Sequence, residues 1–248
     1  MTGAISIFKQ IRLLIFIAGL GAVITGCVSS SVNTTSNSHE APKSGAQILL
    51  MQPDVELSLL TASGLREPRA DWSKQAQGLI IAEIEKNLAG NGHELRQHSL
   101  DTDNAHEVQL IKLHEAVGNT ILLHRFFNQP LPSKKDKFDW SLGPGVATLA
   151  DNYDADYALF IFARGAYASA ARQATALVLA VAGVGVGTGD QAAFASLVNL
   201  ETGDIVWFNV TVTGSGIDMR RPSGAESVVK GLMKDNPLTT HATDKAKS

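Results

Sequence analysis

The chain has 248 residues, with 21 Lys and Arg against 24 Asp and Glu, which gives a formal net charge of −3 at pH 7. This length is sufficient for one domain with a sizeable core beyond any leader and tail. The charge balance lacks the basic footprint of nucleic-acid binding, in which neutralised phosphates supply most of the affinity. We therefore expect no nucleic-acid partner.

The N-terminal segment predicts export. A positively charged flank precedes twelve apolar or small residues at 13–24. That run is shorter than the roughly 20 residues of a membrane-spanning helix, but it fits the apolar region of a secretory signal. Its end, Ile24-Thr25-Gly26-Cys27, resembles the lipobox of bacterial lipoproteins, in which the cysteine is acylated and becomes the mature N-terminus. We expect residues 1–26 to be the signal peptide.

Cys27 is the only cysteine of the chain, so it has no disulfide partner there. An unpaired thiol in an exported protein needs an explanation, and lipidation supplies one. The alternative is an ordinary signal peptide whose cleavage site adjoins a cysteine. Val28 follows, where an aspartate would signal retention at the inner membrane in many such lipoproteins. The resemblance therefore implies an outer-membrane anchor, with the domain in the periplasm.

Composition divides the remainder of the chain into three parts. Without residues 1–26 it keeps 19 Lys and Arg against 24 Asp and Glu, a formal net charge of −5. Residues 27–45 are rich in Ser, Thr and Asn, which predicts a flexible tether because such a segment buries too little apolar surface to become ordered. Residues 46–236 are expected to form one periplasmic domain, and 237–248 a disordered tail.

The first half of this domain predicts two strands and two helices. An apolar run at 48–60, interrupted by Pro53, indicates a strand leading into an edge or bulge. Asp71 can cap a helix over 71–92, in which apolar side chains recur every four residues. A short strand at 93–100 follows, and a second helix begins at Asp103 or Asn104.

The second half predicts a short helix, three strands and a final helix. Pro144 suits the first turn of a helix ending near Tyr153. The almost wholly apolar run after Asp156 predicts a central strand. Residues 201–204, Glu-Thr-Gly-Asp, predict a hairpin turn between two further strands, and 224–236 a helix. The expected fold class is α/β (α+β), a mixed β-sheet with helices packed against it, in the order β-α-β-α-α-β-β-β-α.

Two stretches carry a resemblance. The sequences DNYDADYALFIFA at 151–163 and SLVNLETGDIVWF at 196–208 resemble the layout of periplasmic domains similar to the N-terminal domain of the TolB protein and the curli-secretion lipoprotein. The whole chain resembles a group of proteobacterial outer-membrane lipoproteins. Such families serve as envelope scaffolds, secretion parts and activators, so the resemblance implies no catalytic residue.

The usual signatures of chemistry are absent from the sequence. His106-Glu107 and His114-Glu115 lack the second histidine of a helical zinc site, so surface or capping histidines, His124 included, are favoured. The acidic clusters near Asp101 and Asp154 lack the glycine and distal glutamate of an EF-hand loop. The glycines match neither a dinucleotide nor a phosphate loop, and Ser215 lacks a nucleophile elbow. We expect no cofactor, no metal and no catalytic residue.

Two functional hypotheses remain open. The first is a lipid-anchored scaffold or assembly lipoprotein of the cell envelope that acts through contacts with an envelope protein or with further copies of itself. The second is a membrane-tethered small-ligand-binding or hydrolytic domain, which requires a concave site with converging titratable groups.

The uncharged run at 173–189 is the candidate contact surface. A helical face is present early in the run, but from Gly183 onward glycine alternates with valine or threonine, which favours extended chain. The first interpretation is a hairpin or strand extension folded against the domain itself. The second is a glycine-rich interface with a partner or another subunit, and the third is membrane insertion by analogy with curli-pore hairpins. The candidate residues are Val181, Gly183, Val184, Gly185, Val186 and Gly187.

Overall fold

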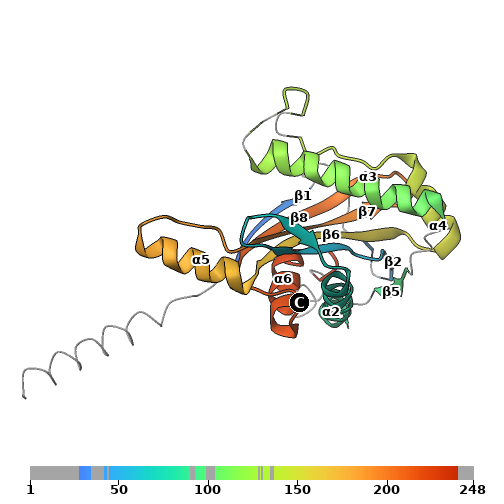
Figure 1. Cartoon of the computed structure of the whole chain (residues 1–248). Coiled ribbons are helices and arrows are strands. Elements are labelled where there is room, and N and C mark those ends of the chain that lie inside the picture. Colours follow the sequence, from blue (N-terminus) through green and yellow to red (C-terminus); the bar gives the residue numbers. More distant parts are fainter. Residues whose placement is uncertain are drawn as a thin grey trace, which may run out of the picture.

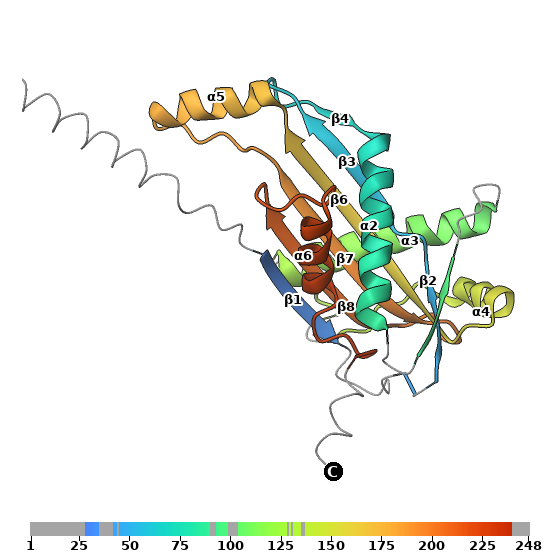
Figure 2. The same ribbon diagram turned by 90° about the horizontal axis from the view of Figure 1, so that it is seen from below.

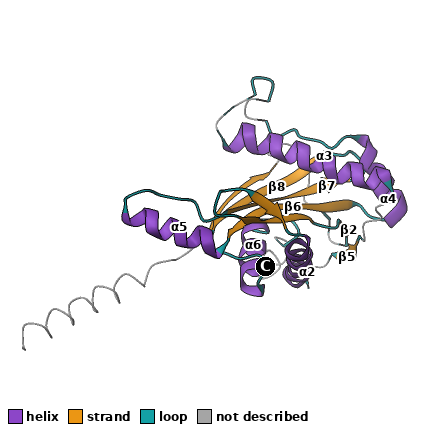
Figure 3. Ribbon diagram, viewed as in Figure 1, coloured by secondary structure: helices purple, strands orange, loops and turns teal. Residues whose placement is uncertain are grey.

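The computed structural model describes residues 28–34, 42–43, 45–89, 93–98, 104–127, 129, 131–134 and 137–239. These residues contain an eight-stranded mixed sheet in the order β1-β8-β7-β6-β2-β5, in which β3 pairs with β6 and with β4. Helices α2 and α6 cover one face of the sheet, and α3 and α4 cover the other (Figure 1, Figure 3). The predicted fold class is confirmed.

The elements have the following bounds. The strands are β1 Val28–Thr34, β2 Gln47–Leu50, β3 Asp54–Leu60, β4 Arg66–Pro68, β5 Glu94–Gln97, β6 Tyr157–Ala168, β7 Asp190–Asn199 and β8 Ile205–Gly214. The helices are α2 Ala70–Leu88, α3 Ala105–Ile121, α4 Ala147–Tyr153, α5 Ala170–Val181 and α6 Pro222–Leu232. A π-helical turn, η1 Leu122–Phe126, continues α3, and a 3₁₀ turn, η2 Pro144–Val146, precedes α4.

Strand β6 is central, as its apolar sequence predicts. One edge pairs in parallel with β2 and then with β3, and the other pairs antiparallel with β7. Its side chains alternate between two cores: Leu159 and Ile161 lie in the cluster beneath α2 and α6, and Phe160 and Phe162 in the cluster beneath α3 and α4. The break at Pro53 lets a single apolar run supply both β2 and β3.

The structure corrects the predicted tether. Residues 28–34, expected to be flexible, form edge strand β1, which pairs antiparallel with β8 from Val28 opposite Thr213 to Thr34 opposite Trp207. The backbone of β8 would otherwise present an unpaired edge, and backbone pairing needs no apolar side chains, so a polar segment can occupy it. The predicted tail is also wrong at its start, because Leu238 is buried in the core under α6.

The structure tests the residues predicted to begin helices α2 and α3 and the predicted hairpin turn. The N-cap of α2 is Arg69, and the predicted cap Asp71 lies in the first turn. Asn104 caps α3 as predicted, accepting a hydrogen bond from the Glu107 amide. The hairpin between β7 and β8 turns at Gly203, whose φ of 80° suits glycine.

Helix α3 packs closely on the sheet at Gly118. A Cβ at this position would lie 2.1 Å from the Cε2 of Phe194. Phe194 is itself buried and stacked between Phe162 and Phe208, with ring centroids 4.5 and 5.4 Å away. The ring therefore has little room to move, and only glycine lets the helix approach this far.

This contact yields a paired prediction. Gly118→Ala should lower the free energy of unfolding by about 1–3 kcal/mol, because the added methyl group overpacks the core. Gly78→Ala, in the exposed middle of α2, meets nothing within 4 Å. It should leave stability unchanged or raise it by up to about 1 kcal/mol through helix propensity. Chemical denaturation of both variants tests this, and equal effects would contradict the close packing.

Candidate functional site

Helix α5 and the chain that returns from it form a protrusion. Residues 169–189, here called the α5 protrusion, leave the end of β6 and return to β7, extending beyond the sheet (Figure 2). No residue of α5 is buried. Leu177, Val178 and Val181 expose 71%, 70% and 89% of their surface. A contiguous apolar face of this kind marks a contact surface in soluble domains.

The local sequence explains why this segment is helical. Ser169 is the N-cap, and its side chain accepts a hydrogen bond from the Arg172 amide at 3.1 Å. The helix that follows is rich in alanine and leucine, which favour it. It ends where Gly183 adopts a φ of 78°. Glycine alternation starts only there, so the predicted hairpin over 173–189 is wrong.

The base of the protrusion is fixed to the domain. Arg172, the only charged residue in 169–189, donates from Nε to the Gly187 carbonyl at 3.0 Å and from Nη1 to the Ala62 carbonyl at 3.4 Å. The Ala168 amide donates to the Thr188 carbonyl at 3.2 Å. The Arg172 guanidinium therefore connects helix α5 to the returning chain at the base. The outer part of the protrusion carries no charge.

The candidate interface residues lie on the outer, returning part. Val181 and Val184 are exposed, and Val186 is half-buried. A Cβ added at Gly183, Gly185 or Gly187 would meet nothing within 4 Å. The interpretation as a segment folded against its own domain is therefore wrong. The partner and membrane interpretations stay open at this point.

The lipobox-like residues Ile24, Thr25, Gly26 and Cys27 lie outside the described residues, so their roles stay predictions. The chain that follows them is placed by strand register. Val28 is opposite Thr213 of β8, Thr213 is opposite Gln191 of β7, and Gln191 is opposite Gly165 of β6. The start of β1 and the base of the α5 protrusion thus lie at the same end of the sheet.

A second polar feature was not predicted from the sequence. Arg164, in the middle of β6, contacts Asp54 at 3.0 Å and Glu115 at 3.2 Å, and its guanidinium lies 3.9 Å from the ring centroid of Phe162. Lys112 contacts Asp54 at 3.2 Å. Burial would raise the pKa of Asp54, but Arg164 and Lys112 hold it below its ordinary value. A lone arginine in an otherwise apolar strand is the sequence signal for such a network.

A small cavity lies beside this network. It has a volume of about 210 Å³, and its charged lining groups are Asp54 and Lys112. Drug-sized ligands occupy sites of roughly 300–1,000 Å³ with converging polar groups. Because Asp54 and Lys112 already pair with each other, the network works as a structural connection between β3, β6 and α3.

The histidines have separate environments. Among the described residues, no group of three or more His, Cys, Asp or Glu is placed to hold a metal. His106 lies 3.0 Å from the Gly145 carbonyl, and His124 contacts the Gln129 carbonyl. His114, predicted to be a surface or capping residue, is instead buried, with Nε2 2.9 Å from Ser196 Oγ. The face that α3 presents to the sheet includes this polar position, which apolar periodicity alone misses.

Burial of His114 predicts an acid-sensitive fold. Desolvation lowers its pKa from 6.5 to about 3, against a smaller opposing effect of Asp54. Between these values the unfolded chain binds one more proton than the folded chain, so stability falls as the pH falls. The loss attributable to His114 is about 1.4 kcal/mol per pH unit, or about 2 kcal/mol from pH 7 to 5. Denaturant unfolding of wild type should show this excess loss over His114→Gln, and equal losses would contradict it.

Comparisons with known proteins give low similarities. No protein-family model and no curated protein matches the chain. The PelC dodecamer from Paraburkholderia phytofirmans is 13% identical with a TM-score of 0.39, covering 86% of this chain and 98% of that chain. Lipoprotein GNA1162 from Neisseria meningitidis is 12% identical with a TM-score of 0.28, covering 67% and 78%. The resemblance to the TolB N-terminal domain stays a prediction.

Proposed function

We propose that the chain is a lipid-anchored protein of the bacterial envelope whose α/β domain is held at the membrane surface and acts by binding other proteins. The observation that carries this proposal is the position of β1. Its first residue, Val28, directly follows the lipobox-like quartet and is already paired with Thr213 of β8. The predicted lipid and the sheet are therefore adjacent in the chain, with no spacer between them.

This arrangement has a physical consequence for binding. An anchor with several acyl chains holds a protein on a bilayer firmly, whereas one chain binds only marginally. A short connection also restricts the orientation of the domain, so the same surface always faces outward. A scaffold benefits because anchoring and fixed orientation raise the effective concentration of its binding surface for a partner on the same membrane. Val28 after Cys27 favours the outer membrane, facing the periplasm.

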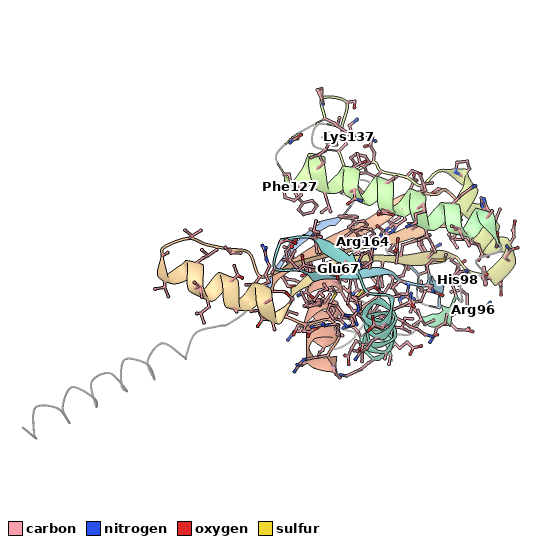
Figure 4. All side chains as sticks on the ribbon, viewed as in Figure 1. Glu67, Arg96, His98, Phe127, Lys137 and Arg164 are labelled. Carbon is pink, nitrogen blue, oxygen red and sulfur yellow. The ribbon has the colours of Figure 1, made fainter. Side chains whose placement is uncertain are left out.

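The end of α3 offers a surface for such a partner. Phe127, which directly follows turn η1, exposes 66% of its surface, and Leu123 on η1 is also exposed. Phe126 faces the other way and packs on Phe208, with centroids 6.2 Å apart. Figure 4 shows Phe127 at the end of α3, on the face of the sheet away from α2 and α6. Exposed aromatic side chains are enriched in protein interfaces.

Within the described residues, the cavity beside Asp54 is small and its facing charges are paired with each other, so it gives little support to a tethered ligand-binding or hydrolytic domain. We therefore propose binding, without catalysis, as the activity of this domain.

The anchor is tested by metabolic labelling with palmitate. Wild type should incorporate label, and Cys27→Ala should not, because its side chain cannot form a thioester or thioether. Immunoblotting for equal amounts of both proteins is the control. Equal labelling of the two would contradict the anchor.

The binding role is tested by photo-crosslinking in the living cell. A photoreactive phenylalanine analogue at position 127 should give one discrete adduct, which Leu123→Glu should weaken by placing a charge beside it. The same analogue at Lys86, an exposed position at the far end of α2, is the matched control and should give none. Absence of an adduct at 127, or equal adducts at both positions, would contradict binding through this surface.

A further inference from the structure

We propose that the α5 protrusion rests in the interfacial region of the same membrane that holds the lipid anchor, with Leu177, Val178 and Val181 against the acyl chains. This inference rests on the anchor in the proposed function and adds a second membrane contact, made by the protein itself. In this proposal a lipid surface covers the exposed apolar face of α5.

Strand register places the protrusion beside the anchor. Val28 and Gln191 both lie opposite Thr213 of β8, on its two sides. They are therefore two strand spacings apart, about 10 Å. Cys27, the residue predicted to be acylated, directly precedes Val28 in the sequence. The protrusion starts at Ser169, directly after β6, and ends at Gly189, directly before β7. A membrane that receives the lipid at position 27 therefore meets this end of the sheet first.

The composition of the protrusion suits a lipid surface. Residues 173–189 are seventeen uncharged residues with no carboxylate, so nothing there is repelled by anionic head groups. The charge of Arg172 lies at the base, where the head groups would be. The contacts of Arg172 with Gly187 and Ala62 fix the protrusion to the domain. The apolar face is therefore already ordered before it meets a membrane.

The length of α5 indicates that it lies in the interface. Twelve helical residues are about 18 Å long, against a hydrocarbon core about 30 Å thick. Within the described residues, no helix combines the length and apolar character needed to cross a membrane. A short helix with an exposed apolar face instead binds at the boundary between head groups and acyl chains.

The test uses the full lipidated chain in proteoliposomes. Because acylation occupies the only native cysteine, Val181→Cys introduces a single free thiol for an environment-sensitive fluorophore such as NBD. The vesicles contain phosphatidylethanolamine, phosphatidylglycerol and a phosphatidylcholine with a doxyl quencher on its acyl chain. Val181 is highly exposed, so the substitution leaves the fold intact. We expect the doxyl lipid to quench the probe at 181 at least twofold and to shift its emission to the blue.

Lys86→Cys is the matched control. Lys86 lies near the end of α2 whose residue Glu85 contacts Gln97 of β5, at the opposite end of the sheet from the protrusion. A probe there should show no quenching. Equal quenching at 181 and 86, or none at 181, would overturn the inference.

The remaining outcomes are also decisive. Self-quenching of the probe at 181 between copies, without quenching by the doxyl lipid, would show that a second copy covers the protrusion, and would overturn the lipid assignment. Vesicle flotation separates this inference from the proposed function. Protein that floats but is not quenched retains its anchor and lacks the second contact, whereas protein that does not float contradicts both.

Discussion

Pairing along both edges of strand β6 is the constraint on which the other elements depend. This twelve-residue strand pairs with β2 and β3 on one edge and with β7 on the other. Its alternating side chains divide the interior into two cores, each covered by its own helices. The α5 protrusion leaves one end of β6, and the salt-bridge network of Arg164 ties the middle of the strand to α3 and β3.

The parts of the fold that follow from local sequence could be predicted. The continuous apolar run after Asp156 predicts a buried strand. The Glu-Thr-Gly-Asp sequence at 201–204 predicts the hairpin turn, in which Gly203 adopts a positive φ. The periodic apolar residues of α2 define its buried face. In each case the information lies within one element, so neighbouring elements are not needed to read it.

The rest depends on contacts between distant parts of the chain. Strand β1 is polar, and nothing in its sequence reveals that the open edge of β8, at the other end of the chain, will pair with it. Asp54 and Arg164 are 110 residues apart in sequence. His114 is buried because α3 crosses the sheet at that position, which helical periodicity cannot show. In the α5 protrusion, the glycine pattern after Gly183 obscured a helix that ends just before it.

The two proposals unite the N-terminus and the protrusion in one account. The proposed lipid at position 27, strand β1 that begins one residue later, and the apolar helix α5 at the same end of the sheet would together define the side of the domain that faces the membrane. The exposed Phe127 surface lies on the face of the sheet covered by α3. A domain attached in this way presents the same surface to every partner on the membrane.

The claim on which this account rests is that β1 joins the predicted anchor directly to the sheet. Hydrogen–deuterium exchange of the lipidated protein measures it directly, because ladder amides open only when the strand leaves the sheet. The account predicts that the amides of 28–34 that face β8, about every second one in an edge strand, are protected in the lipidated protein. Exchange of all amides of 28–34 at the rate of the denatured protein would show a free tether and contradict the account.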